Sequence, residues 1–553
     1  MEMKKKMQGE MQRETQREMQ REDLLVNRLV RYGKTNMYPF HMPGHKRTGS
    51  MGFPDPFTVD ITEIDGFDNL HHPEGILKRS MEWAAGVYGA DRTYYLVNGS
   101  SSGILSAICG TVPRGGRILV SRNCHKAVYH GIFLNQLKAS YVYPQEVPGL
   151  GIQGGITPQD VDQMLRRYMD TKAVLIVSPT YDGVVSDIRG IAQVVHRAGL
   201  PLIVDEAHGA HFRYGEMFPC SALDLGADVV IQSVHKTMPS LTQTALLHIK
   251  NNRPEGGCYA NAQKIDRYIH MVQTTSPSYV LMASIENSIY QMEHMDLEPY
   301  SQRLGTLRQR LSGLKCLRLA GLDLKGTSGI FDLDCSKIVL STRGTSLADA
   351  TGWEKSGIKS GIKSGINSGI NRGDNGPGSG QGRGPGSVSG AGPGSDSLPC
   401  FTGAMLDDIL RRVYRLEMEM CGADYVTAIS TVMDNDQGLS RLGDALCEID
   451  SRLKPVSWDT TASSVYSMRS DTAMTIADAM DGELHDVKLK DSAGCISGEF
   501  IYIYPPGIPI VAPGEWISRR ALDIILEYMD KKLPVQGPED QELTYLKAVK
   551  TTD

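Results

Sequence analysis

The residues of this sequence best suited to chemistry lie at the end of an apolar run, in "VVIQSVHK" (229–236). A lysine amine is a nucleophile only when it is neutral, which requires a desolvated or cation-rich pocket. If the strand continues through this stretch, Ser233 and His235 point to one face and Val234 to the other. Lys236 is a candidate catalytic amine, although these residues alone are equally compatible with a lysine in a turn.

A second polar cluster ends the next apolar run upstream, in "LPLIVDEAHGAH" (200–211). Asp205 follows the run directly, and His208 and His211 come just after it. An acid at this point could cap a helix, bind a metal or pair with a buried cation. An Asp and a Lys at the ends of neighbouring strands could face the same ligand.

Two further stretches could contribute to such a site. In "YLVNGSSSGILSAI" (95–108), a glycine and three serines precede an apolar helix, so backbone N–H groups, hydroxyls and the helix dipole could bind an anion. Neither a dinucleotide G-x-G-x-x-G nor a Walker A motif is present, and a serine cap explains this stretch equally well. In "RNCHKAVYHG", His125 follows the next apolar run, where a structural role is the usual one.

The elements that must position these residues alternate along the chain. Short apolar runs such as "AVLIVSPT" and "LPLIVDEAHG" are separated by amphipathic segments such as "TPQDVDQMLRRYMD", which has a Thr N-cap followed by Pro. Strands buried on both faces and separated by helices predict an α/β fold with a mostly parallel sheet. Ligands bind outside the carboxyl ends of such strands, so the polar strand ends should converge on one site.

Composition limits the class of protein. The chain has 553 residues, a net charge of −6, 41% hydrophobic and 22% charged residues, as in an ordinary globular protein with several domains. The charge gives no indication of nucleic-acid or membrane binding, and no apolar stretch is long enough to span a membrane. The ten cysteines are scattered, which favours reduced thiols in the cytoplasm.

The pattern divides the chain into several parts. Residues 1–35 are expected to form a helical arm, 36–300 a major α/β domain, 301–351 with 399–440 a small α/β domain, and 441–553 a C-terminal α+β domain. Residues 352–398 are rich in Gly, Ser and Pro and predict a disordered insertion. The small domain should resume with a helix at "MLDDILRRVYRLEMEM", and "GEFIYIYPPGIPIVAPGEWIS" predicts two strands followed by a helix.

The order of these motifs resembles that of fold-type-I enzymes dependent on pyridoxal phosphate: an anion cup, a strand-end His, a strand-end Asp and then Ser-x-His-Lys. More narrowly, the sequence is similar to the Orn/Lys/Arg decarboxylase family over about residues 24–345 and 400–535. The motifs that carry this resemblance are "PFHMPGHKRTG" (39–49), "DITEIDGFDNLHHPEGIL" (60–77), "YLVNGSSSG", "RNCHKAVYHG", "SPTYDGV", "VDEAHGAHF", "QSVHKTMPSLTQTALLH", "QTTSPSYVLMASIE" and "YPPGIPIVAPGE".

The resemblance implies a role for each matching residue. Lys236 would hold pyridoxal 5'-phosphate covalently, Asp205 would pair with its protonated ring nitrogen, and His125 would stack on the ring. His208 would lie close to cofactor and substrate, and Thr180 is a weaker candidate near the ring hydroxyl. Implied phosphate ligands are Ser100, Ser101, Ser233 and His235, while Thr275 and Ser276 would reach the cofactor of a neighbouring subunit in a homodimer or larger oligomer. No metal is implied.

The expected reaction is decarboxylation of arginine, lysine or ornithine to an amine of the polyamine pathway, by a short form without the family's N-terminal wing domain. Bidentate pairing with a carboxylate slightly favours arginine. Glu417, Glu419 and Glu499 are the candidate acids, although each fits a solvated surface position at least as well. The alternatives are another fold-type-I reaction such as transamination, or an inactive regulator with this fold. Barrel-type ornithine decarboxylases are set aside, because their cofactor lysine lies near the N-terminus of a barrel, whereas Lys236 follows the strand that ends at Asp205.

Overall fold

The computed structural model describes residues 24–49, 52–251, 259–348, 400–457, 469–503, 507–530 and 534–550. The expected insertion at 352–398 and most of the expected N-terminal arm lie outside these described residues. In the described part of the arm, α2 (Leu25–Gly33) is a helix with no buried residue. No helix within the described ranges is long and apolar enough to cross a membrane.

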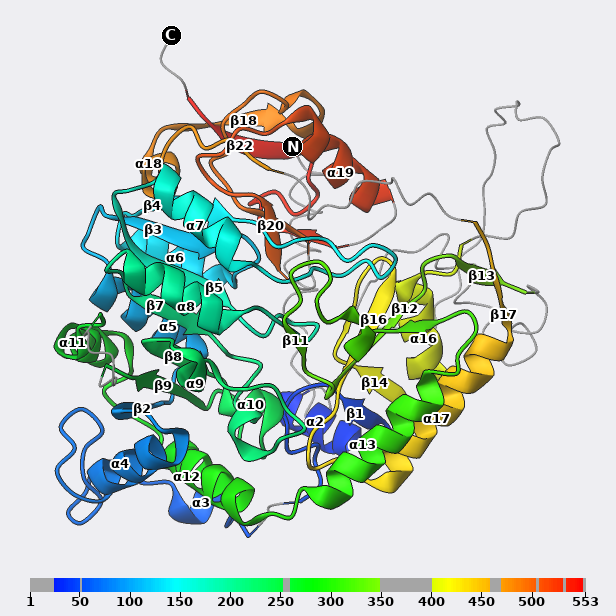
Figure 1. Cartoon of the computed structure of the whole chain (residues 1–553), viewed down its shortest axis with the longest axis horizontal. Coiled ribbons are helices and arrows are strands. Elements are labelled where there is room, and N and C mark those ends of the chain that lie inside the picture. Colours follow the sequence, from blue (N-terminus) through cyan, green and yellow to red (C-terminus); the bar gives the residue numbers. More distant parts are fainter. Residues whose placement is uncertain are drawn as a thin grey trace, which may run out of the picture.

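A seven-stranded sheet forms the centre of the largest body (Figure 1). Neighbours from β8 through β7, β5 and β3 to β4 pair in parallel, and β9 alone runs against the others, between β2 and β8. The prediction of a mostly parallel α/β sheet is confirmed. In spatial order the strands are β2 (Arg92–Leu96), β9 (Ala245–Ile249), β8 (Val229–Gln232), β7 (Leu202–Asp205), β5 (Thr171–Val177), β3 (Arg117–Ser121) and β4 (Lys138–Val142).

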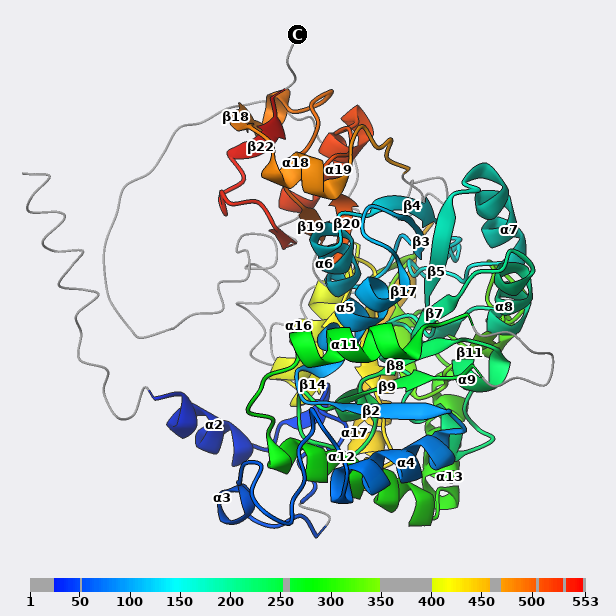
Figure 2. The ribbon, with the colours of Figure 1, turned by 90° about the vertical axis from the view of Figure 1, so that its left-hand side faces the viewer.

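Helices cover both faces of this sheet (Figure 2). Successive residues of β7 belong to the hydrophobic cores on opposite faces of the sheet. Ile203 shares one core with Ile104 and Ile265, whereas Val204 shares the other with Ile191. The predicted helix after Thr157 is confirmed with a full capping box to Asp160. One face carries α5 (Gly99–Thr111), α6 (Lys126–Leu134) and α11 (Ala262–Val272), and the other carries α4 (Ile76–Tyr88), α7 (Pro158–Arg167), α8 (Ile188–Arg197) and α9 (Ala222–Leu225).

A second body is built on a four-stranded antiparallel sheet, β10 (Arg318–Leu319), β12 (Lys337–Ser341), β16 (Tyr425–Ile429) and β15 (Met420–Cys421). Around it lie α13 (Glu298–Leu311), α16 (Gly403–Arg412) and α17 (Asp436–Ser451) (Figure 1). The expected helix over 405–420 is wrong in its second half. Helix α16 stops at Arg412, and β14 (Leu416–Met418) instead pairs in parallel with β1 (Tyr38–Phe40), so strand pairing overrides the helical propensity of this stretch.

The C-terminal body contains the two predicted strands and the predicted helix, as β19 (Ile501–Ile503), β20 (Ile508–Val511) and α19 (Arg519–Asp530), while the expected turn at 504–506 lies outside the described residues. With them are β21 (Val535–Gln536), α18 (Ile476–Asp481) and the pair β18 (Leu484–Lys488) and β22 (Tyr545–Val549). A buried ion pair fastens this body to the large sheet: Arg122, just after β3, donates to Glu515 at 3.0 Å. The guanidinium also lies 4.8 Å from the ring centre of Tyr141.

Candidate active site

The polar strand ends meet at one cavity beside the carboxyl edge of the large sheet. Ser100 comes from the start of α5, His125 from the start of α6, Asp205 from the end of β7, and Lys236 from the segment after β8. Ile508 of the C-terminal body also lines the cavity. The remaining lining residues are Ile104, Asn123, Cys124, Gln153, Val177, Pro179, Thr180, Tyr181, Asp182, Ala207 and His208.

Lys236 lies in the single-turn helix α10 (Val234–Thr237), not in an extension of the strand. The expected alternation of Ser233, Val234 and His235 about a strand is therefore wrong, because β8 ends at Gln232. The Nζ atom of Lys236 lies 2.9 Å from Nε2 of His208. Burial lowers the pKa of Lys236, and the negative charges of Asp205 and Glu419 only partly oppose this. The amine therefore has more of its neutral, nucleophilic form than an exposed lysine.

Asp205 is buried at the bottom of the cavity, with 4% of its surface exposed. One carboxylate oxygen accepts the backbone N–H of Ala207 at 3.1 Å. Burial raises the pKa of Asp205, and the nearby charge of Lys236 acts in the opposite direction. A cation placed against this carboxylate would stabilise the ionised form, so the environment suits an acid that pairs with a positive group on a ligand.

His208 is buried beside the lysine, and its ring centre lies 4.4 Å from that of Tyr181. Burial first, and then Lys236, lower the pKa of His208 well below its ordinary value, so the ring is neutral near pH 7. Its Nδ1 atom has no hydrogen-bond partner within the described part of the chain. A neutral imidazole at this distance can exchange a proton with the amine of Lys236.

His125 is fixed at the cavity wall by its own helix. It is the N-cap of α6, where its Nδ1 accepts the backbone N–H of Ala127 at 3.2 Å. The surrounding protein atoms, and then the charge of Lys236, lower its pKa to about 4. The side chain nevertheless stays open to the cavity, so a neutral aromatic ring is available to contact a bound molecule.

Two of the predicted anion ligands, Ser100 and Ser101, lie in the first turn of α5. Gly99 has φ +72°, Asn98 makes no side-chain cap, and Ser101 is exposed next to Ser100. A third, Ser233, directly follows β8, and its hydroxyl is fully buried and has no hydrogen-bond partner in the described chain. An uncapped helix N-terminus and a buried orphan hydroxyl suit an anion.

His235 is the fourth of these predicted ligands. Its Nδ1 lies 2.8 Å from the carbonyl oxygen of Thr244, which leaves Nε2 to face a ligand. Burial lowers the pKa of His235 to about 4, so the ring is neutral near pH 7. Because Nδ1 donates to that carbonyl, Nε2 carries no proton in the neutral ring. Nε2 could donate to an anion only if the negative charge of that anion drew a second proton onto the ring.

Thr275 and Ser276 are exposed and do not line the cavity of their own chain. Their loop is nevertheless held near α5, because the backbone N–H of Thr274 donates to Asn98 at 3.0 Å. Of the sequence-predicted site residues, the structure thus brings together Ser100, His125, Thr180, Asp205, His208 and Lys236 at the cavity. Ser101 follows Ser100 in the chain, and Ser233 and His235 lie within three residues of Lys236, but these three do not line the cavity.

Comparison with known proteins identifies the family. The Orn/Lys/Arg decarboxylase major domain matches residues 24–304, and the C-terminal domain of the same family matches 459–534. The arginine decarboxylase of Halalkalibacterium halodurans is 31% identical, covering 95% of this chain and 97% of that protein. The arginine decarboxylase of Bacillus anthracis is 30% identical with the same coverage. The chain belongs to the Orn/Lys/Arg decarboxylase family.

Solved structures agree on the fold of this decarboxylase. The lysine decarboxylase of Francisella novicida has a TM-score of 0.65 at 18% identity, covering 95% of this chain and 81% of that one. The constitutive lysine decarboxylase of Escherichia coli has a TM-score of 0.62 at 18% identity, with 96% and 78% covered. The fold is therefore of fold type I, as predicted, and the chain is an amino-acid decarboxylase of a pyridoxal-phosphate-dependent family.

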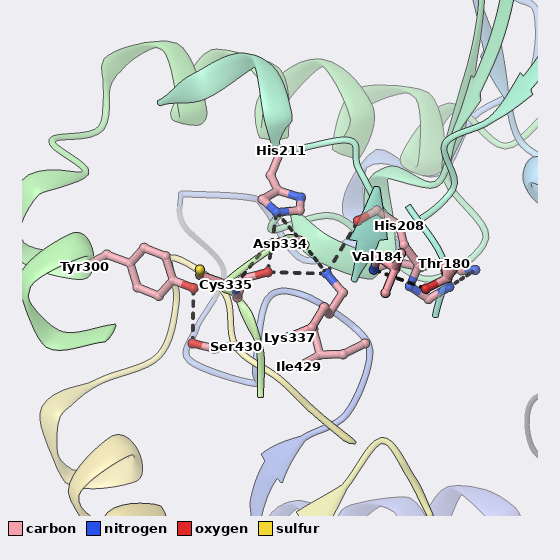
Figure 3. Close-up of polar contacts among 12 residues, drawn as sticks. Thr180, Val184, His208, His211, Tyr300, Asp334, Cys335, Lys337, Ile429 and Ser430 are labelled. Carbon is pink, nitrogen blue, oxygen red and sulfur yellow. Dashed lines mark hydrogen bonds and ion pairs between the residues drawn. The ribbon is translucent and has the colours of Figure 1, made fainter. Parts of the chain in front are cut away.

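A buried charge cluster of Asp334, Lys337 and His211 contacts the segment that carries His208 (Figure 3). Asp334 accepts from Lys337 at 2.7 Å and lies 3.2 Å from Nε2 of His211, all three being buried. Although burial opposes it, the charges of Lys337 and His211 lower the pKa of Asp334. Lys337 also reaches the backbone carbonyl of His208 at 3.5 Å. The second body thereby fixes the segment that carries His208.

Sequence reasoning missed this cluster and part of the cavity wall. Lys337 begins the apolar run "KIVLS". A lysine in an otherwise apolar strand is the one signal in the sequence that could have indicated a special role for it. Tyr181 and Asp182 lie in "SPTYDG", of which only Thr180 was singled out. Tyr181 donates to Glu419 at 2.6 Å, a contact between residues 238 positions apart that no local pattern reveals.

Proposed function

We propose that this enzyme decarboxylates a basic amino acid, with arginine preferred over lysine and ornithine, using pyridoxal 5'-phosphate held on Lys236. The observation that carries the proposal is the cavity in which a lysine amine with a lowered pKa lies beside a neutral histidine and above a buried carboxylate. The names of the relatives with about 30% identity, arginine decarboxylases, support the choice of arginine.

The unpartnered groups of this cavity fit that cofactor. The hydroxyl of Ser233 and the uncapped start of α5 suit its phosphate, with Ser100, Ser101 and His235 as further ligands. Asp205 suits a protonated ring nitrogen, and His125 offers a ring face. When bound, the cofactor supplies an electron-accepting ring for the carbon that loses carbon dioxide.

Residues of the chain would carry out the proton transfers and exclude water. Lys236 would hold the cofactor through its amine, whose exchange for the substrate amine needs the proton-free form. His208, 2.9 Å from Nζ of Lys236, accepts and returns the proton that this exchange requires. Ile508 and the aromatic ring of Tyr181 help to exclude water from the reacting carbon. Thr180 lies at the cavity wall and is a candidate partner for the ring hydroxyl of the cofactor.

A homodimer belongs to the proposal, with Thr275 and Ser276 completing the partner's site. The neighbouring segment supports a self-interface: Ile64 and Phe67 are 50% and 45% exposed, and His71 of the same segment lies 2.7 Å from the carbonyl oxygen of Thr274. Sedimentation velocity of the purified chain should show a dimer or larger at micromolar concentration, and a monomer would contradict this assignment. We further propose that the enzyme acts in the cytoplasm, in polyamine synthesis.

A substrate panel tests the proposed reaction. Purified enzyme with added pyridoxal phosphate should release carbon dioxide from arginine, with kcat/KM at least tenfold higher than for lysine or ornithine. The same samples should contain the corresponding amine and no keto acid, since transamination would produce one. Release from none of the three amino acids would refute the proposal, and a preference for lysine or ornithine would refute the choice of arginine.

A further inference from the structure

A basic substrate attached at the Lys236 end of the cavity carries a second positive charge at its far end. Burying that charge without a partner would be costly, so the cavity should provide a carboxylate at a distance from Lys236. Asp205 is the acid beside Lys236 itself, and its charge acts on that lysine. Among the cavity-lining residues, the one other carboxylate is Asp182.

Asp182 is buried, with 6% of its surface exposed, in the loop between β5 (Thr171–Val177) and β6 (Val184–Val185). Its polar contacts are with neutral hydroxyls: Thr427 donates to one oxygen at 3.2 Å, and Tyr425 also hydrogen bonds to it. No lysine or arginine of the described ranges forms an ion pair with it. Burial raises the pKa of Asp182 to about 7, which the two hydroxyls only partly oppose.

The three acids considered from the sequence are committed elsewhere. Glu417 pairs with Arg411 at 3.2 Å. Glu419 accepts from the hydroxyl of Tyr181 and the backbone N–H of Met42, one on each oxygen. Glu499 accepts the backbone N–H groups of Glu539 and Lys547, at 2.6 and 2.7 Å. Unlike Asp182, none of these three residues lines the cavity.

We propose that Asp182 binds the distal cationic group of the substrate and thereby sets the preference for basic amino acids. A carboxylate offers about four acceptor positions, and two neutral donors leave room for two more N–H groups. A guanidinium presents two parallel N–H donors that match this geometry, which makes Asp182 a specificity residue for arginine. The inference rests on the proposed function and adds to it the residue that recognises the side chain.

The test compares a charged substrate with a neutral one of the same shape. Citrulline replaces the guanidinium of arginine by an uncharged ureido group and keeps the reacting end. Wild-type enzyme should favour arginine over citrulline strongly in kcat/KM. Asp182→Asn should lower kcat/KM for arginine by about 100-fold or more while changing that for citrulline less than about fivefold, because only the charged pair is lost.

Matched variants separate this role from a general effect on the site. Glu417→Gln removes a sequence-predicted acid that does not line the cavity, and it should leave the arginine-to-citrulline ratio at the wild-type value. Asp182→Ser is a second variant with the same expected loss of selectivity, for use if the asparagine variant does not fold. Cofactor absorbance and the melting temperature of each variant show whether the fold and the cofactor site persist.

The effect of Asp182→Asn on the melting temperature should depend on pH. The pKa of Asp182 is raised in the folded state, so its stabilising contribution is complete below pH 4 and is lost as the pH rises through 7. Asp182→Asn should therefore raise the melting temperature of substrate-free enzyme more at pH 8 than at pH 5. A decrease at pH 8 would mean that Asp182 has a structural role in place of the one proposed.

The possible failures can be told apart. If wild-type enzyme decarboxylates none of the basic amino acids, the proposed function is refuted. If wild-type enzyme uses arginine but a folded Asp182 variant keeps the arginine-to-citrulline ratio within about threefold of wild type, the proposed function stands and the role of Asp182 is refuted. A collapse of that ratio in either folded variant, with citrulline turnover retained, supports the role.

Discussion

Replacing Lys236 with alanine is expected to lower kcat for the preferred amino acid by at least about four orders of magnitude, as when the covalent residue of other enzymes is removed. The amine of Lys236 has a lowered pKa and a neutral histidine 2.9 Å away, and no other lysine lines the cavity. Nothing within the described cavity wall could therefore take over covalent attachment and product release. Single-turnover and steady-state release of carbon dioxide measure the loss.

The matched control for this variant is Lys172→Ala. Lys172 is an exposed lysine on β5 of the same sheet, and its replacement should leave kcat within about twofold of wild type. If the defect of Lys236→Ala is the missing amine, an added small primary amine should restore part of the turnover. Residual activity above about one per cent of wild type without such an amine would contradict the covalent role of Lys236.

Much of the fold was predictable because the central strands are buried on both faces and therefore appear as short apolar runs. The direction of β9 was not, since "ALLHI" is entirely buried and the same pattern fits a parallel or an antiparallel strand. Likewise, the stretch "MLDDILRRVYRLEMEM" was expected to be helical through residue 420. The pairing of Pro39 with Glu417, far apart in the chain, was not accessible from that pattern.

The candidate site was predictable where its residues come from strand ends in sequence order, as Asp205 and Lys236 do. It was not predictable where a residue matters through a contact with another body of the protein. Asp182 was not among the candidate acids of the sequence, and its hydrogen bond from Thr427 joins residues 245 positions apart. The one-turn helix at Lys236 was missed for a different reason, because four residues are too few to show helical periodicity.

Asp205→Asn is expected to lower kcat by about three orders of magnitude while the cofactor stays attached to Lys236. The carboxylate lies at the bottom of the cavity and is stabilised in its charged form only by a nearby cation and one backbone N–H. A neutral amide cannot stabilise a positive ring nitrogen, so the ring would accept electrons less readily, whereas phosphate binding and covalent attachment would be unaffected. Stopped-flow absorbance and kcat, measured together, separate attachment from turnover.

Glu206, the next residue in the chain, provides the control that makes this prediction specific. It is equally buried but does not line the cavity, and it accepts from Ser221, Gln232 and the backbone N–H of Ala222 at 2.9, 2.6 and 2.7 Å. Glu206→Gln loses part of this network and should lower the melting temperature, with kcat of the folded enzyme near wild type. Asp205→Asn should instead lower kcat without lowering the melting temperature. It removes a buried charge, which is costly to the fold, and that same charge is the one expected to pair with the ring nitrogen. Equal effects of the two variants on kcat would show that Asp205 acts only through the fold.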